Sequence, residues 1–328
     1  MNNFKSIAVL LLLVGFGACK ESAKTTYLPE STGAINSLVV VMDNQLWKGE
    51  VGDKVREHFA ASVVGLNMAE PLFTITYMPE SVFSGAIQKS RSVLLVAKGS
   101  ESKVGIRKDV YAGPQNLAII TGTSIQEINA NIDAKAEEII KTYKDLEIQE
   151  QQKRFKRSLN KELVLKEKFG ITLDIPSAYK VGSQKENFVW IDRQVPKGAM
   201  NLIVYTMPEN AFDNDTTFVQ DILSMRDSIG SINIPGEDIP DKKNYMVSER
   251  NFAPHIYPAE IAGLKAAEVR GLWEMNNYPM GGPYLMYIIN DKERNRKLII
   301  EGFIFAPATQ KRDNMFELEA IIKTLKFQ

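Results

Sequence analysis

Residues 124–146 read SIQEINANIDAKAEEIIKTYKDL, and this stretch decides how the chain is divided. Ser124 and Glu127 have the spacing of a capping box, in which the two side chains satisfy backbone N–H groups at the start of a helix. An apolar face follows at helical spacing and consists of Ile125, Ile128, Ile132, Ile139, Tyr143 and Leu146. The sequence therefore predicts a long helix that packs one face against a core.

The helix is expected to change character after Leu146. Residues Glu147 to Ser158 are almost all charged or polar, with Phe155 as the aromatic exception. A helix without an apolar face has little to bury, so we expect this part to continue as a solvated connector, with a disordered linker as the alternative. The boundary between two domains is placed here, and residues 124–160 are predicted to form a long connecting helix.

Short apolar runs before this helix predict the strands of a first domain, residues 35–123. These runs are Ser37–Met42, Leu72–Tyr77, Ser92–Ala97 and Leu117–Thr121. Trp47, Val51, Val55 and Phe59 recur every fourth residue and predict a helix after the first strand. Short helices between strands fit either an α+β or an α/β domain.

Alternating apolar and polar residues predict an antiparallel sheet in a second domain, residues 161–328. The expected strands are Phe169–Pro176, Phe188–Asp192, Asn201–Thr206 and Ala267–Met275, followed by a hairpin of Tyr284–Asn290 and Lys297–Phe305. A capping box at Thr217 and Gln220 predicts one helix, and Met315, Leu318, Ile322 and Leu325 mark another. The predicted fold class is α+β: two sandwich-type domains, with mostly antiparallel sheets and packed helices, joined by a long helix.

The N-terminus predicts an export signal. Lys5 precedes the apolar run Ile7–Phe16, which is too short to span a bilayer, and small residues lead to Cys19, the only cysteine. The segment Phe16-Gly17-Ala18-Cys19 resembles the lipobox of bacterial lipoproteins, which implies a signal peptide at 1–18 and lipid on Cys19. Residues 19–34 would form a polar tether, and the protein is expected on the outer membrane, at its periplasmic or cell-surface face. The alternative is a buried cysteine in a cytosolic protein.

The amino-acid composition limits which kinds of binding and catalytic site the protein can form. Forty basic residues balance forty acidic ones, so no global field would recruit nucleic acid. If Cys19 carries lipid, no disulfide or thiolate site remains, and the two histidines, His58 and His255, lie far apart in sequence. The sequence therefore predicts no cofactor and no metal site, and it names no catalytic residue.

Three short features could carry chemistry, but each also has a structural interpretation, which we favour. Asp213-Asn214-Asp215-Thr216-Thr217 has the D-x-D-x-T pattern of haloacid-dehalogenase-type phosphatases, yet it does not follow a strand directly and Thr217 is expected to cap a helix. Asp43 ends the first predicted strand, where it could act in a site or cap a helix. His58 and His255 have no identifiable catalytic partner in the sequence.

An aromatic cluster is the best candidate for a binding site. Around the turn Gly281-Gly282-Pro283, the side chains of Trp273, Tyr278, Met280, Tyr284 and Tyr287 could line a groove for a sugar ring or a peptide. Packing inside a hairpin core is the competing interpretation.

Two resemblances cover much of the chain. In Leu38–Trp47, Val51–Ala60 and Trp273–Tyr284 it resembles an uncharacterised family of bacterial envelope lipoproteins, which implies no catalytic residues. Phe169–Tyr179 and Ile321–Phe327 are similar to the first strand and last helix of PsbP-like domains, which implies a protein-binding accessory domain.

The leading hypothesis is a non-enzymatic, membrane-anchored binding or assembly module of the cell envelope, with an envelope protein or glycan as its partner. The alternative is a carboxylate-dependent hydrolase acting on envelope glycans or peptides, because two acidic side chains from distant segments can meet in a cleft without leaving a motif.

Overall fold

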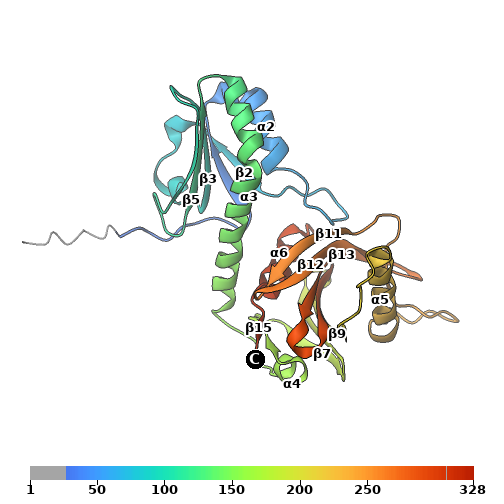
Figure 1. The fold of residues 1–328 in the computed structure, drawn as a ribbon. Helices are drawn as coiled ribbons and strands as arrows, with labels where there is room; N and C mark the ends of the chain where they lie inside the picture. Colours follow the sequence, from blue (N-terminus) through green and yellow to red (C-terminus); the bar gives the residue numbers. More distant parts are fainter. Residues whose placement is uncertain (1–26, 308) are drawn as a thin grey trace, which may run out of the picture.

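A computed structural model describes residues 27–307 and 309–328. Two bodies of mixed helix and sheet lie along one long helix, α3 (Ile125–Phe155), which runs from the first body down to the second (Figure 1). Ser124 caps this helix as predicted, because its side chain accepts a hydrogen bond from the N–H of Glu127 at 3.2 Å. The two-domain α+β architecture is confirmed.

The first domain holds a five-stranded sheet in the order β2-β1-β3-β5-β4. Its strands are β1 (Ser37–Val41), β2 (Thr74–Met78), β3 (Ser92–Lys98), β4 (Lys103–Lys108) and β5 (Asn116–Gly122). Four of these strands are parallel, and only β4 is antiparallel to its neighbour. This sheet therefore follows the α/β alternative rather than the mostly antiparallel arrangement expected for both domains.

Helices cover both faces of this first sheet. Side chains alternate along β1, so that Leu38 and Val40 face α2 (Glu50–Phe59) and α3, while Val39 and Val41 face the opposite side. The short helix α1 (Asn44–Lys48) precedes α2, and the 3₁₀ turns η1 (Glu80–Val82) and η2 (Gly85–Lys89) cover the second face. Both faces are buried, which explains the continuous apolar runs in the sequence.

The second domain is built on an antiparallel sheet with the order β10-β12-β13-β14-β9-β8-β7, and β11 also pairs with β12. The strands are β7 (Lys180–Lys185), β8 (Phe188–Val195), β9 (Gly198–Pro208), β10 (Met246–Ser248), β11 (His255–Ile261), β12 (Leu264–Met275), β13 (Tyr278–Asp291) and β14 (Arg296–Phe305). The turn η3 (Lys292–Arg294) closes the predicted hairpin of β13 and β14.

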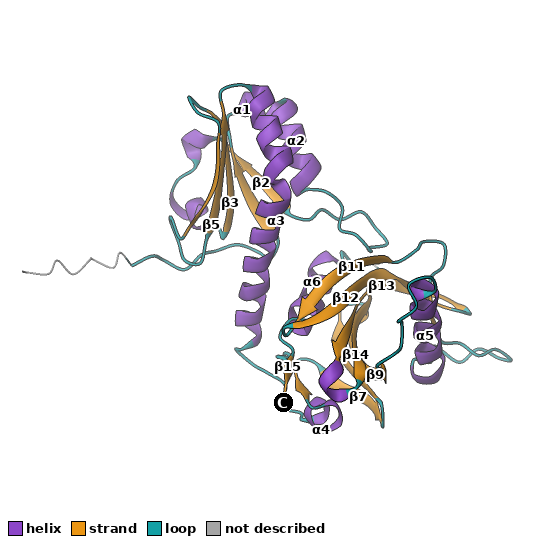
Figure 2. Cartoon of the chain, in the orientation of Figure 1, coloured by secondary structure: helices purple, strands orange, loops and turns teal. Residues whose placement is uncertain are grey.

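Helices cover the two faces of this second sheet. Helix α5 (Phe218–Asn233) packs on one face, and α6 (Arg312–Ile322), with α4 (Val164–Phe169) and the end of α3, packs on the other. A small two-stranded sheet of β6 (Ile171–Thr172) and β15 (Lys326–Phe327) lies near the C-terminus (Figure 2).

Three local predictions are corrected. The second half of α3 is neither a solvated connector nor a disordered linker, because Ile148 and Phe155 are buried in the core of the second domain. The expected strand Phe169–Pro176 is mostly not a strand, since α4 ends at Phe169, only the two residues of β6 form a strand, and Pro176 makes an isolated bridge to Leu159. Thr217 makes no capping bond to the backbone; its hydroxyl donates to the Asp221 carboxylate at 2.7 Å.

Candidate functional site

One buried residue, Asn36, joins four segments of the chain at the junction of the domains. Its backbone N–H donates to Glu147 of α3 at 3.2 Å, and its carbonyl accepts from Thr74 of β2 at 2.8 Å. Its side-chain oxygen accepts from Lys144 of α3 at 2.9 Å, and its side-chain nitrogen donates to Asp313 of α6 at 3.0 Å. The backbone of Asn36 is left-handed, with φ of 55°, a conformation that asparagine tolerates well.

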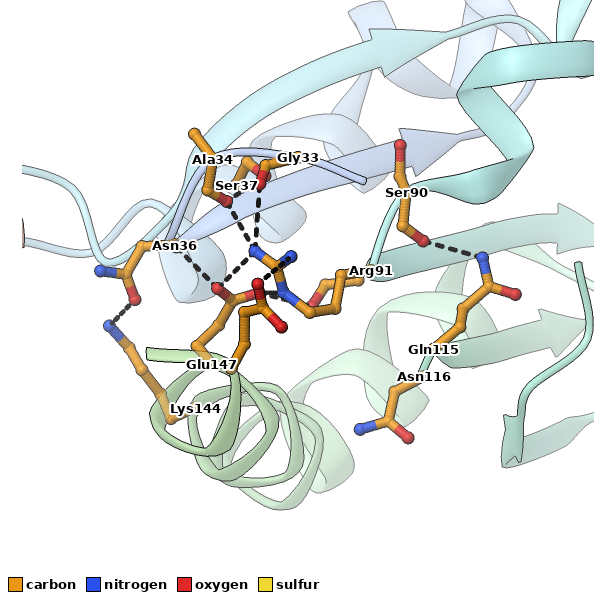
Figure 3. A network of polar contacts seen from close by, with 12 residues as sticks. Gly33, Ala34, Asn36, Ser37, Ser90, Arg91, Gln115, Asn116, Lys144 and Glu147 are labelled. Carbon is orange, nitrogen blue, oxygen red and sulfur yellow. Dashed lines mark hydrogen bonds and ion pairs between the residues drawn. The ribbon is translucent and has the colours of Figure 1, made fainter. Parts of the chain in front are cut away.

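A buried ion pair fixes the segment before β1, residues 30–36, which we call the strap. The Arg91 guanidinium donates to both carboxylate oxygens of Glu147 at 2.9 Å (Figure 3). The same guanidinium reaches the carbonyl oxygens of Gly33 at 3.3 Å and Ala34 at 3.0 Å. The side chains of Arg91 and Glu147 are 1% and 0% exposed, so loss of either one would leave the charge of the other buried without an ionic partner. Arg91 therefore links the strap to α3.

A carboxylate of the first domain caps a helix of the second. Glu70 accepts hydrogen bonds from the backbone N–H groups of Lys311 and Arg312, at 2.8 and 2.9 Å, where α6 begins. These N–H groups have no partner within the helix, and a negative charge is favourable at a helix N-terminus. Arg312 in turn donates to the carbonyl of Pro71 at 2.9 Å. The two domains are thus joined by specific polar contacts.

A cavity of about 270 Å³ opens at this junction. Both domains and α3 contribute to its walls, which are formed by Val63, Val64, Leu72, Lys144, Asp145, Ile148, Tyr257, Arg270, Arg312, Met315, Phe316, Glu319 and Lys323. Most of the exposed wall is apolar, and four cationic side chains converge on it. Such a combination of apolar lining and a few polar groups is typical of small-molecule sites.

Lys144 is the most unusual group of the cavity. Its ammonium lies 5.0 Å from the ring centres of both Phe73 and Phe316, one from each domain, in cation–π contacts. It donates to the carbonyl of Leu72 at 3.3 Å as well as to Asn36. Burial lowers the pKa of Lys144 to about 8, because desolvation disfavours the charged amine. This lysine can therefore lose its proton close to neutral pH.

Glu319 lies on the α6 wall of the cavity between two cations. Arg270 donates to it at 2.8 Å and Lys323 at 2.6 Å. Burial alone would raise the pKa of this carboxyl, but Arg270 and Lys323 outweigh burial and hold the pKa at about 2. A carboxylate that stays ionised in this way is poorly suited to act as a general acid at neutral pH.

The aromatic cluster predicted from the sequence does not line a groove. Trp273 and Tyr284 are 2% and 1% exposed and belong to the core beneath α5, together with the partly buried Met280. Tyr287 faces the opposite side of the sheet, where its hydroxyl donates to Glu268 at 2.7 Å. Tyr278 alone is substantially exposed. Alternation along β12 and β13 places these residues on two faces of the sheet, where all except Tyr278 pack at least partly into the core.

The other residues weighed in the sequence lie at a helix cap or on the surface. Asp43 caps α1 by accepting from the N–H of Gln45 at 2.7 Å. Asp213 is exposed and pairs with Lys297 at 3.2 Å, in a turn after an antiparallel strand. His58 contacts Asp133 of α3 at 2.7 Å on the surface, and His255 is exposed at the start of β11. Cys19 lies outside the described residues.

Sequence reasoning did not find the residues of the junction. Lys144 carries a faint signal, because it stands between Ile140 and Ile148 at steps of four residues, where an apolar residue is expected. Asn36 and Glu70 have no signal in the sequence, because their partners Asp313 and Lys311 are 277 and 241 residues away. Such distant pairs are visible only in the folded chain.

Across residues 27–307 and 309–328, no helix is long and apolar enough to cross a bilayer. In the same ranges, no three histidine, cysteine or acidic side chains gather as they would around a metal ion.

Comparison with known proteins matches both halves of the chain to families. Residues 31–156 match the family described as "Domain of unknown function (DUF8532)", and residues 158–324 match "Domain of unknown function (DUF4837)". The border between the two matches falls at the end of α3. No curated protein matches the chain. Because the second match covers half of the chain, the protein belongs to the DUF4837 family, whose defining domain has no known function.

Proposed function

We propose that the protein is a membrane-anchored, non-enzymatic binding module of the cell envelope. The junction cavity is the observation that carries the binding function, because both domains contribute walls to it and it combines apolar lining with converging cations. The polar contacts of Asn36, Glu70 and Arg91 join the segments that form or support those walls. A preformed site of this kind loses little conformational entropy when a ligand binds.

The anchor in this proposal rests on the sequence around Cys19. The strap begins eleven residues after Cys19, and an extended chain spans at most about 3.3–3.6 Å per residue. A lipid on Cys19 would therefore keep the start of the strap within roughly 40 Å of a membrane surface. The proposal places the protein at the outer membrane.

The hydrolase alternative finds less support in the cavity. Such an enzyme needs two carboxyl groups facing one another, one of which can hold a proton at working pH. The acidic residues of the lining are Glu319, whose pKa is held near 2, and Asp145, which pairs with Lys141 at 2.6 Å. Both are engaged with cations, so a binding role fits the geometry better.

Two measurements test the proposal in cells. In the first, cells fed an alkyne-bearing fatty acid express the tagged wild-type protein or a Cys19→Ala variant, and lipid incorporation is read on gels. We expect lipid label on the wild-type protein only. Label on the Cys19→Ala variant, or on neither protein, would contradict a lipid anchor at Cys19.

The second measurement is crosslinking and pull-down from intact cells, with Cys19→Ala as the mislocalised control. We expect the wild type to recover a defined set of envelope components that the variant lacks. Steady turnover of glycosidic, ester or phosphoester substrates by the purified protein would instead favour the hydrolase.

A further inference from the structure

Lys144 differs from the other cationic residues of the junction cavity in its hydrogen-bond partners. Arg270 and Lys323 pair with Glu319 at 2.8 and 2.6 Å, and Arg312 pairs with Asp313 at 2.8 Å. Lys144 has no carboxylate partner among the ion pairs of residues 27–307 and 309–328; its described acceptors are the neutral oxygens of Asn36 and Leu72. A largely buried ammonium is usually paired with an anion, because burial without one is costly.

The shape of the cavity suggests what could supply the missing charge. Around Lys144, the walls carry the aliphatic side chains of Leu72, Ile148 and Met315. Two lining residues, Val64 and Tyr257, are 39% and 42% exposed, so apolar surface continues from the cavity toward solvent. Exposed apolar residues at the edge of a cationic pocket indicate a ligand with both an apolar body and a negative end.

We propose that the junction cavity binds an aliphatic carboxylate, whose negative end pairs with Lys144 and whose apolar body lies against the walls. The described contacts of Lys144 use two of its three N–H groups, so one donor is left for the ligand. A charge-assisted bond of this kind is among the stronger hydrogen bonds in proteins. The inference rests on the proposed binding function and names the class of ligand for the same cavity.

Binding should depend on pH through Lys144. The charged groups that act on it are Glu147 on its own helix, Glu319 and Arg312 on α6, and Arg270 on β12. Arginine does not titrate near neutral pH, and Glu319 is ionised down to about pH 2. Affinity for a carboxylate should therefore be nearly constant between about pH 6 and 7, where the ligand is ionised and Lys144 is charged, and fall above pH 8 by up to about tenfold per pH unit.

The test uses the full chain and octanoate as the probe, with binding followed by calorimetry. Octanol has the same apolar body without the charge, and N-acetyl-leucine carries a carboxylate of the kind that ends a peptide. The variant Lys144→Met removes the charge while retaining an apolar stem. The matched control is Lys135→Met on the same helix, where the lysine side chain is 48% exposed and pairs with Glu138, which does not line the cavity.

We expect octanoate to bind the wild type and the Lys135→Met variant alike, and Lys144→Met at least about tenfold more weakly, since a charge-assisted bond is lost. Because Lys144→Met could also disturb folding, the pKa of Lys144 in the wild-type protein gives an independent measurement by NMR. Octanoate should raise this pKa, and octanol should not.

The outcomes separate the sources of the ligand and the two proposals. Tighter binding of octanoate indicates a fatty-acyl ligand, and tighter binding of N-acetyl-leucine indicates the end of a peptide; both support a carboxylate site. Three results would each overturn the carboxylate proposal: octanol binds as tightly as octanoate, Lys144→Met binds octanoate as tightly as the wild type, or neither carboxylate binds. If the carboxylate test fails but the pull-down still recovers envelope components, the proposed binding function is retained and the ligand belongs to another chemical class.

Discussion

Replacing Asn36 should weaken the whole junction. Asn36→Gly removes both side-chain hydrogen bonds, to Lys144 and to Asp313, but keeps the backbone bonds to Glu147 and Thr74. Glycine also adopts the left-handed conformation at φ of 55° without strain. Asn36→Ala removes the same two bonds and adds the cost of a Cβ atom in that conformation. Comparing the two variants therefore separates the hydrogen bonds from the backbone conformation.

The expected magnitude follows from the two lost bonds. A hydrogen bond to a charged group contributes about 1.5–3 kcal/mol to stability, and both partners of the Asn36 side chain are charged. We expect Asn36→Gly to lower the free energy of unfolding by about 3–5 kcal/mol, allowing for some rearrangement of the exposed Asp313. Asn36→Ala should lose about 1 kcal/mol more, because alanine is disfavoured at positive φ.

The assay is urea unfolding followed by circular dichroism and by tryptophan fluorescence. Asn295 provides the matched control, because it has a φ of 49° but is exposed, so its variants report the conformational cost alone. Asn295→Gly should be close to wild type, and Asn295→Ala should lose about 1 kcal/mol. If Asn36→Gly is within about 1 kcal/mol of Asn295→Gly, then the side chain of Asn36 does not hold the junction, and the reasoning fails.

Two further predictions concern the other charged groups of the junction. Arg91→Met should cost about 3–5 kcal/mol by leaving Glu147 buried without a partner, whereas the double variant Arg91→Met/Glu147→Leu should recover part of that loss; a double-mutant cycle in urea showing additive losses would contradict this. Glu319 has a pKa of about 2 in the folded protein, below its ordinary value of 4.5, so its ionised form stabilises the fold above pH 4.5 and the benefit is lost as pH falls toward 2. The stability difference between wild type and Glu319→Gln should thus be about 2–3 kcal/mol at pH 6 and shrink markedly at pH 3, and a difference that is equal at both pH values would exclude this role.

Local patterns predicted most of the elements because they depend on neighbouring residues. The apolar stripe and the Ser124 cap define α3, and alternation along Ala267–Met275 defines β12. The expectation failed where distant residues decide burial. The sequence predicts that Glu147 is solvated, but its carboxylate is buried in an ion pair with Arg91, which lies 56 residues earlier. Aromatic content likewise suggested a groove at Trp273, although the neighbouring strands bury that side chain.

The predicted and observed candidate sites differ for a similar reason. Motif reasoning favours residues that are close in sequence, such as the aromatic residues around Gly281–Pro283. The cavity instead takes its walls from segments between Val63 and Lys323, none of which has a distinctive composition. A site that forms only where two domains meet leaves no compact motif, so the structure was needed to locate it.

The contact between Asn36 and Asp313 has a consequence for the order of folding. Closing a loop of 277 residues is entropically costly, so this contact is expected after the local contacts within each domain. Since Lys311 follows Glu70 by 241 residues, Glu70 is expected to stay exposed on the first domain until α6 docks. The cavity is then the final part to assemble, and ligand binding becomes a property of chains that have completed folding.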